Sequence, residues 1–344
     1  MASHVTVRRR AYPEIVVSVL MPAYNAAHTL KSSLLSILCQ TWRCLEVVVI
    51  NDGSTDETGK VLARIARKDS RVRVIERSNG GIVAALNQGW SECSGTYVAR
   101  MDADDISLPW RLATQVAYME RHRDVAASGT GILPFQTGAP FLGLPARFPT
   151  DEAGIRTRLL FNPPIMHPTA IFRRSMLPAE APYSTLMPQA EDYELWSRLA
   201  STHRYGNIGT IGLLYRRTAS SISSMRRDEQ LQQASALRIQ NLARTIGDDF
   251  AIHHGAEHVE LMARRHSPLE LVDRLPNLVD ELSASALLSW AVLRQVWFSY
   301  CLSLSRAGGH GSSLFGRVER ARSALRQSFL RAAEASKRTD PRLR

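Results

Sequence analysis

The chain has 344 residues and a formal net charge of +11, and 44% of its residues are hydrophobic and 22% charged. This length provides for one large α/β domain with an appendage, or for two domains. Its four cysteines form no Cys-x-x-Cys pair, which fits a reducing compartment and argues against a cysteine zinc site. No apolar h-region follows the arginines at positions 8–10, and no stretch reaches the roughly 18–20 apolar residues of a membrane span, so neither a secretory signal nor a spanning helix is predicted.

The positive charge is concentrated near the C-terminus, where ten Lys/Arg face three Asp/Glu from Leu304 onward. No nucleic-acid recognition motif and no interleaved aromatic residues accompany these arginines, so nucleic acid is not predicted as a partner. An anionic membrane surface and an acidic substrate remain as partner classes that such a charge favours.

The first hundred residues alternate apolar strands with helices. Leucines at helical spacing predict a helix after the first strand, and Ser54 with Glu57 forms a capping box for a helix from Thr55 to Ala66. The strands are predicted at residues 16–21, 45–50, 72–75 and 96–100. Continuous apolar strands that alternate with helices predict a parallel sheet covered on both faces.

Polar clusters follow three of these strands. Tyr24-Asn25 follows the first and Asp52 the second, while Asp102, Asp104 and Asp105 follow the fourth. Parallel strands bring such ends to one edge of the sheet, where open α/β folds bind their ligands. Mg²⁺ and Mn²⁺ prefer oxygen ligands, so the Asp-x-Asp predicts a metal–diphosphate clamp; the alternative is an acidic turn that caps the next helix.

That next helix is predicted to begin with Ser107 as its N-cap and Pro109 in its first turn. Further along, Val125–Ser128 is a short strand, residues 135–149 form a Gly/Pro-rich loop, and a helix starts near Glu191. There is no Gly-x-Gly-x-x-Gly after the first strand and no P-loop motif, which argues against a dinucleotide oxidoreductase and a P-loop ATPase.

Five segments, in order along the chain, resemble the motifs of the family 2 glycosyltransferases of bacterial cell-surface polysaccharide synthesis. They are VSVLMPAYNAAHTL, VVVINDGSTDET, NGGIVAALNQG, YVARMDADDISLPWRL and AEDYELWSRLA. The resemblance covers about residues 15–225 and implies a GT-A fold, an α/β Rossmann-like architecture with a mostly parallel central sheet. It further implies inverting transfer of a sugar from a UDP- or GDP-linked donor to an acceptor hydroxyl.

The resemblance assigns the donor side of the site residue by residue. It places the base and ribose against Pro22, Ala23, Tyr24 and Asp52, and it gives the metal, Mn²⁺ or Mg²⁺, to Asp104 and Asp102. Asp102 is alternatively a ribose ligand, and Asp105 supports the loop. Asn79 and Asn87 fall in the stretch that lines the donor site in relatives, although a loop residue and a helix-face residue need no such role. Relatives carry Arg or Lys near Ala84 or Ala85, so the diphosphate contact has to come from elsewhere or is missing.

On the acceptor side, the resemblance makes Asp192 the general base. Glu191 and Asp192 also suit the first turn of a helix on electrostatic grounds, which is the alternative account of both acids. His167 is expected near the donor, where a neutral imidazole orients an acceptor hydroxyl and a charged one meets phosphate; a purely structural histidine is equally open. Arg216 is available for the diphosphate, and Thr218 stands where relatives commonly have histidine.

The predicted organisation is an N-terminal arm at 1–14, a GT-A domain at 15–225 and a helical region at 226–344. The basic terminal helix either packs on the enzyme or docks it on the cytoplasmic face of a membrane, next to a sugar or lipid-linked acceptor. We therefore expect a cytoplasmic, metal-dependent transferase of single sugars in polysaccharide or glycolipid synthesis. The alternatives are a glycosyltransferase-like binding or scaffold protein without turnover and a nucleotidyltransferase, which would need a basic loop after the first strand.

Overall fold

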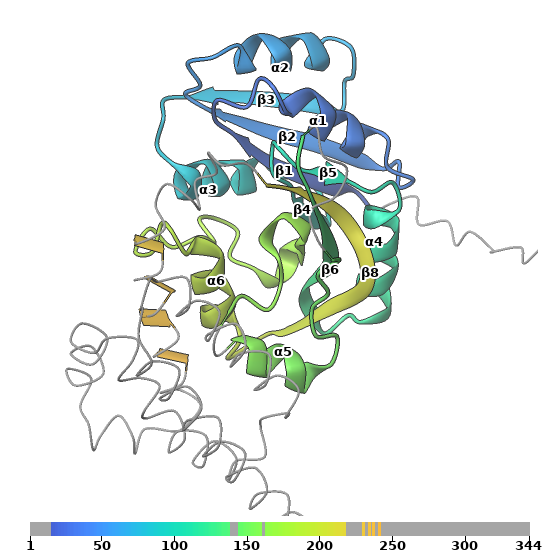
Figure 1. Cartoon of the computed structure of the whole chain (residues 1–344), viewed down its shortest axis with the longest axis vertical. Coiled ribbons are helices and arrows are strands. Elements are labelled where there is room, and N and C mark those ends of the chain that lie inside the picture. The colour runs from blue at the N-terminus through green and yellow to red at the C-terminus, as the bar shows by residue number, and fades with distance from the viewer. Residues whose placement is uncertain are drawn as a thin grey trace, which may run out of the picture. The chain divides into compact units, whose positions relative to one another are not determined.

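The computed structural model describes residues 15–137, 144–159 and 162–217, together with scattered positions between 229 and 241 (Figure 1). The expected N-terminal arm, Thr218 and the basic terminal helix lie outside the described residues. The boundary expected near residue 225 also falls there and stays a prediction.

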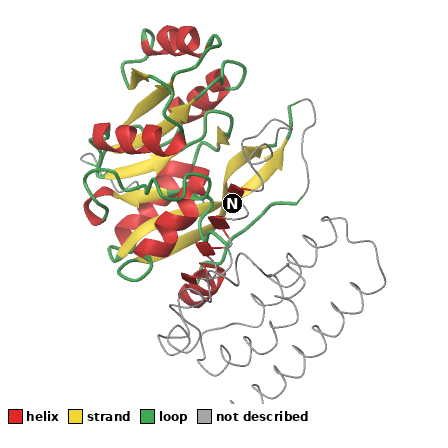
Figure 2. Cartoon of the chain, turned by 90° about the vertical axis from the view of Figure 1, so that its left-hand side faces the viewer, coloured by secondary structure: helices red, strands yellow, loops and turns green. Residues whose placement is uncertain are grey.

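Within the described part of the chain, eight strands form one sheet, seen in yellow in Figure 2. Its order is β3-β2-β1-β4-β7-β6-β8-β5. The strands are β1 (Val17–Ala23), β2 (Leu45–Asp52), β3 (Val72–Arg77), β4 (Tyr97–Arg100), β5 (Ile106–Ser107), β6 (Val125–Phe135), β7 (Ile171–Arg173) and β8 (Arg204–Arg216).

The parallel sheet predicted for the first hundred residues is confirmed, because β1 pairs in parallel with both β2 and β4, and β2 with β3. Beyond β4 the sheet is mixed. The short strand β7 lies antiparallel between β4 and β6, and β5 lies antiparallel to β8, while β6 and β8 run parallel. The strand predicted at Val125–Ser128 is longer than expected and continues to Phe135.

Helices bury both faces of the parallel half. The described helices are α1 (Leu30–Leu38), α2 (Thr58–Ala66), α3 (Ile82–Glu92), α4 (Arg111–Arg121), α5 (Glu152–Leu159) and α6 (Glu191–Leu199), with 3₁₀ turns η1 (His167–Thr169) and η2 (Arg174–Met176). Val19 and Met21 of β1 join one core cluster with the leucines of α1 and the apolar side of α4. On the opposite face, Gly89 of α3 lies so close to Leu20 and Ile50 that a Cβ there would stand 2.1 Å from Leu20 Cδ1. Strand β1, which is buried along its whole length, therefore has a helix packed on each face.

Two predicted helix starts are wrong. Helix α2 begins at Thr58, and Ser54 is not its cap, because its hydroxyl donates to Asn51 (2.6 Å) and accepts from the Asn25 N–H (3.0 Å). Ser107 lies in β5, opposite Leu213 of β8, and α4 begins only at Arg111. In both cases the serine makes a contact with a residue distant in the sequence and therefore does not cap the helix that follows it.

The chain divides into two compact units. The first holds the sheet and comprises residues up to Phe148, Ile165–Leu195 and Thr202–Ser221. The second contains Pro149–Pro164, Trp196–Ser201 and the residues from Ile222 on, and in it the buried Asn241 donates to the Leu159 carbonyl (3.0 Å). No helix in the described ranges is long and apolar enough to cross a bilayer.

Candidate active site

The carboxyl ends of β1, β2 and β4 meet at one edge of the sheet, and the acidic residues follow β4 there. Residue Leu20 pairs with Arg100, so the chain leaves β4 beside the end of β1. Carboxylate oxygens of Asp102, Asp104 and Asp105 all lie within 4.8 Å of one another. The structure therefore brings the two acids of the predicted metal clamp, Asp102 and Asp104, together with Asp105.

The acidic loop is held from both sides. On one side, the Ala103 carbonyl accepts hydrogen bonds from the hydroxyls of Thr29 (3.0 Å) and Ser33 (2.9 Å) on α1 and just before it. On the other side, the Arg216 N–H donates to Asp105 Oδ1 (2.8 Å), and its guanidinium donates to the Asp104 carbonyl (2.6 Å). Arg216, which the sequence offers to a diphosphate, is buried and also stacks on Phe135, so in this structure it supports the acidic loop.

Crowding of negative charge makes this cluster a strong candidate for a divalent cation. Burial, with the nearby charge of Asp102, raises the pKa of Asp104 to about 6, and burial with the charges of Asp102 and Asp104 raises the pKa of Asp105. Asp105 is fully buried, and its Oδ2 has no hydrogen-bond partner in the described part of the chain. A buried carboxylate oxygen without a partner is costly, and a bound cation would satisfy it. The residues present fit a hard metal ion.

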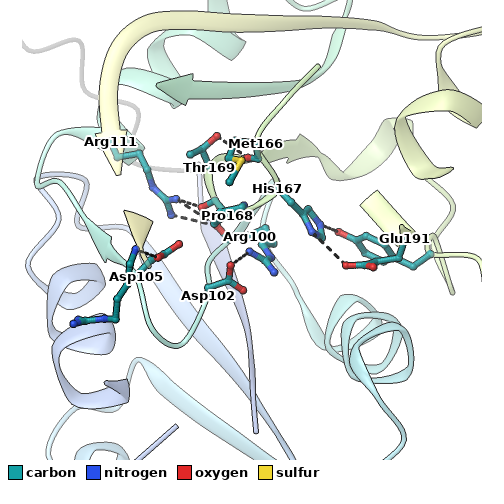
Figure 3. Close-up of polar contacts among 11 residues, drawn as sticks. Arg100, Asp102, Asp105, Arg111, Met166, His167, Pro168, Thr169 and Glu191 are labelled. Atoms are coloured by element: carbon teal, nitrogen blue, oxygen red, sulfur yellow. Dashed lines mark hydrogen bonds and ion pairs between the residues drawn. The ribbon is translucent and has the colours of Figure 1, made fainter. Parts of the chain in front are cut away.

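Arg100, the last residue of β4, connects the two halves of the site (Figure 3). Its guanidinium is buried and forms an ion pair with Asp102. Burial alone would favour the neutral form, but the carboxylate of Asp102 outweighs it and raises the pKa of Arg100; Glu191 acts in the same direction. Arg100 therefore remains a cation between the acidic cluster and the acids of α6.

His167 and the two acids of α6, Glu191 and Asp192, lie close together in the structure. Glu191 and Asp192 occupy the first turn of α6, where Asp192 Oδ1 accepts from the Tyr193 N–H at 2.7 Å. His167 Nδ1 faces Glu191 Oε1 at 3.9 Å across the turn η1, and the imidazole is only 5% exposed. Burial lowers the pKa of His167 well below its usual value, with a smaller contribution from Arg100, so the imidazole is neutral.

The two acids differ in their electrostatic setting. Burial raises the pKa of Glu191 to about 8, with a further contribution from Asp192, while burial raises the pKa of Asp192 and its bond to the Tyr193 N–H opposes the rise. Near neutral pH, Glu191 therefore holds a proton, and the hydrogen bond from the Tyr193 N–H favours the ionised form of Asp192.

The residues expected around the nucleotide base lie at the same carboxyl edge of the sheet, but they differ in exposure and in their protein contacts. Pro22 and Ala23 are buried in β1, and Tyr24 beyond them is 49% exposed. The Asp52 carboxylate accepts from the N–H groups of Gly80 (3.0 Å) and Gly81 (2.8 Å) and pairs with Arg77 (3.0 Å), so it fastens the loop that precedes α3.

Both expected asparagines make protein contacts. Asn79 donates to the backbone carbonyl of Asp52 (3.0 Å), and Asn87 binds the backbone of Tyr183. These bonds explain both side chains structurally, as the non-functional account of each residue anticipated.

Three residues of the site were given no role from the sequence: Arg100, Arg111 and Tyr183. Arg111 is fully buried at the start of α4 and donates to the carbonyls of Pro168 (2.6 Å) and Arg100 (3.4 Å), which joins η1 to the end of β4. Burial lowers the pKa of Arg111 to about 10. For Arg100, the sequence does hold an indication, which is an arginine at the end of an apolar strand, two residues before the first of three carboxylates. Nothing in the sequence marks Tyr183.

The sheet and its strand order, with an acidic cluster at the carboxyl edge, define the fold class, the GT-A fold. Among solved structures, Staphylococcus aureus TarS 1–349 in complex with UDP-GlcNAc shares this fold, with a TM-score of 0.53 at 17% identity over 94% of this chain and 92% of that one. The mannosyltransferase PcManGT of Pyrobaculum calidifontis, in complex with GDP-Man and Mn²⁺, matches with a TM-score of 0.50 at 18% identity over 92% and 86% of the two chains.

The family follows from the sequence comparisons. The family model described as glycosyl transferase family 2 matches residues 18–178. A glycosyltransferase of Haemophilus influenzae, named as uncharacterized, is 32% identical over 263 residues, which cover 72% of this chain and 80% of that protein. The amylovoran biosynthesis glycosyltransferase AmsE of Erwinia amylovora is 34% identical over 215 residues, 61% of this chain and 79% of that one. The chain belongs to glycosyl transferase family 2.

Proposed function

We propose that this protein transfers a single sugar from a nucleoside-diphosphate sugar to an acceptor hydroxyl, with inversion at the anomeric carbon and with a divalent cation as cofactor. The observation that supports this most is the meeting of two acidic groups through one buried cation. Asp102 of the metal-type cluster pairs with Arg100, whose positive charge also opposes the rise that burial causes in the pKa values of Glu191 and Asp192 on α6. The donor side and the acceptor side of a transfer reaction would then face each other across Arg100.

Asp102 and Asp104 are the residues that would hold Mn²⁺ or Mg²⁺, with Asp105 supporting the loop through its bond to the Arg216 N–H. When bound, the cation would neutralise charge that develops on the departing nucleoside diphosphate. Arg216 and the α1 hydroxyls would keep the carboxylates at their spacing, so that little rearrangement is needed when the donor arrives.

Asp192 would remove the proton of the acceptor hydroxyl as its oxygen attacks the anomeric carbon. Inversion in one displacement needs one base on the acceptor side, and the Tyr193 N–H favours the ionised form of Asp192, which is the form that accepts a proton. Its raised pKa makes it a better proton acceptor than an exposed aspartate, while protonated Glu191 adds no second negative charge near neutral pH. Neutral His167 would help to orient the hydroxyl.

For the donor, we propose a uridine or guanosine diphosphate sugar bound against Pro22, Ala23 and Tyr24. The support is by analogy, because the two fold relatives were solved with UDP-GlcNAc and with GDP-Man. Asp52, Asn79 and Asn87 would shape this side through the loop contacts described above. The acceptor we propose is a sugar of a cell-surface polysaccharide or a lipid-linked intermediate, reached at the cytoplasmic membrane face through the basic terminal helix.

The test is a screen of UDP- and GDP-sugars in which the release of nucleoside diphosphate is followed with Mn²⁺, with EDTA, and with the Asp104→Asn variant. We expect release with one donor in the presence of Mn²⁺ and its loss under both other conditions. Full release in EDTA would refute the metal assignment. Donor binding without any release, with Mn²⁺ and a range of sugar acceptors, would instead indicate a binding protein without turnover, as the alanines at 84 and 85 allow.

A further inference from the structure

We propose that Tyr183 is a positioning residue for the acceptor side of the site. Its hydroxyl fixes the ring of His167 and, through that ring, the carboxyl of Glu191 next to Asp192, and Asn87 holds Tyr183 in place. This inference rests on the proposed function, since it assigns to Glu191 and Asp192 the acceptor side of a sugar transfer.

The first observation is that Tyr183 is buried and has both backbone groups hydrogen-bonded, as in a sheet, although it lies in no helix or strand. It belongs to the segment between η2 and α6, yet it is only 2% exposed. The Asn87 amide on α3 donates to the Tyr183 carbonyl (2.8 Å) and accepts from the Tyr183 N–H (2.9 Å). One side chain thus satisfies both backbone groups of a buried loop residue, which would otherwise be left without partners.

The second observation is the contact that this placement produces. The Tyr183 hydroxyl lies 2.9 Å from His167 Nε2, and on the other edge of the ring Nδ1 faces Glu191 Oε1 at 3.9 Å. Figure 3 shows the His167 ring directed toward Glu191. A hydrogen bond to one ring nitrogen selects the tautomer and the orientation of the whole imidazole, and so determines what the other nitrogen presents.

The third observation explains why the ring orientation matters for the reaction. Glu191 and Asp192 are neighbours in one helical turn, and burial together with Asp192 raises the pKa of Glu191 to about 8. A fixed imidazole always presents the same ring edge to the Glu191 carboxyl, 3.9 Å from Nδ1, and so keeps the surroundings of the acid pair constant. A ring free to rotate would present either nitrogen or a carbon edge to Glu191, so fewer molecules would hold the acid pair in one arrangement.

The chain offers a clean variant and a matched control. Tyr183→Phe removes one hydroxyl and keeps the buried ring. Tyr97→Phe also removes a buried hydroxyl, one that bonds Glu120 (2.6 Å) and Arg173 (2.9 Å) at the start of β4, on the edge of the sheet opposite to the acids. Tyr97→Phe loses two hydrogen bonds to charged side chains and Tyr183→Phe loses one to an imidazole, so the control removes at least as much bonding, but only Tyr183→Phe touches the His167 contact.

We expect Tyr183→Phe to lower kcat about 5- to 10-fold with the donor KM unchanged, and Tyr97→Phe to leave kcat unchanged. In a His167→Gln background, Tyr183→Phe should have no further effect on kcat, because its role passes through the ring. Equal kcat values for Tyr183→Phe and the wild type, or an undiminished effect in the His167→Gln background, would overturn the inference while sugar transfer by the wild type still supports the proposed function.

A second measurement does not need turnover. The ¹⁵N NMR signals of His167 in protein labelled at the histidine rings, assigned with His167→Gln, should show one neutral tautomer in the wild type and in Tyr97→Phe. In Tyr183→Phe they should shift toward a mixture of both tautomers. Identical signals in Tyr183→Phe and the wild type would overturn the inference, whether or not any donor is turned over.

Discussion

Replacing Asp104 by asparagine should make the metal-free protein more stable and should remove its response to metal. The carboxyl pKa of Asp104 rises from 3.8 to about 6 because of burial and the charge of Asp102. An acid with a raised pKa in the folded state takes up its proton on folding, so at pH above about 6 its ionised form opposes folding, and the penalty disappears as the pH falls from 6 toward 3.8. Such a rise in pKa corresponds to about 3 kcal/mol. Asp104 is partly exposed, and solvent screening reduces our expectation to about 1–3 kcal/mol at pH 7.5.

The assay is chemical denaturation of the wild type and Asp104→Asn at pH 7.5 in EDTA, and again with Mn²⁺ and UDP or GDP. A cation at 100 times its Kd stabilises the wild type by about 2.7 kcal/mol, and the variant should lose most of this gain. Asp69→Asn is the control of opposite sign, because the hydrogen bond from Arg71 lowers the pKa of Asp69, so this substitution should destabilise the protein. If Asp104→Asn is less stable than the wild type in EDTA and keeps the full gain with Mn²⁺, Asp104 is an ordinary loop residue and the electrostatic account of the cluster is wrong.

Four more predictions concern the acids of the site. Asp192→Asn should lower kcat by about 10²–10⁴-fold and leave donor binding in calorimetry unchanged, and a loss of UDP or GDP binding would place Asp192 on the donor side. Because Glu191 is protonated near neutral pH, Glu191→Gln should retain far more activity than Asp192→Asn at pH 7, and equal losses would contradict this division of roles. Because burial raises the pKa of Asp192, kcat should fall as the pH is lowered, and the fall should already begin at a pH higher than the value of about 4 at which an exposed aspartate titrates. A kcat that stays constant down to a pH of about 4 would exclude this base. Asp52→Ala should lower the free energy of unfolding by about 2–3 kcal/mol in urea because it frees the N–H groups of Gly80 and Gly81, and an unchanged midpoint would show that the loop is held elsewhere.

The first half of the fold could be predicted because short apolar and polar patterns in the sequence directly determine where its strands form and end. The nearly continuous apolar runs within residues 17–23 and 45–52 favour a strand buried on both faces, and the acids after Arg100 end the fourth strand in the predicted place. The first turn of α6 was predicted correctly for the same reason, since Glu191 and Asp192 suit a helix N-terminus.

The rest depended on contacts between residues far apart in sequence. Ser54 has the chemistry of an N-cap, but a partner 29 positions away, Asn25, takes its hydroxyl. Asn87 has the chemistry of a donor-site residue, but it binds Tyr183, 96 positions away. The three-residue strand β7 is too short to carry a periodic signal, and its place between β4 and β6 is decided by pairing alone. Capping and composition rules describe what a side chain can do, and only the assembled fold decides which partner it meets.

The central claim is that Asp192 drives an inverting, cation-dependent transfer. The most direct measurement is ¹H NMR of the anomeric signal during turnover of the accepted UDP- or GDP-sugar with Mn²⁺, recorded on the product glycoside of the wild type and of Asp192→Asn. The account predicts a product of inverted anomeric configuration that forms with Mn²⁺, fails to form in EDTA, and forms at most about one hundredth as fast in Asp192→Asn. A product of retained configuration, or one that the Asp192→Asn variant makes at the wild-type rate, would contradict it.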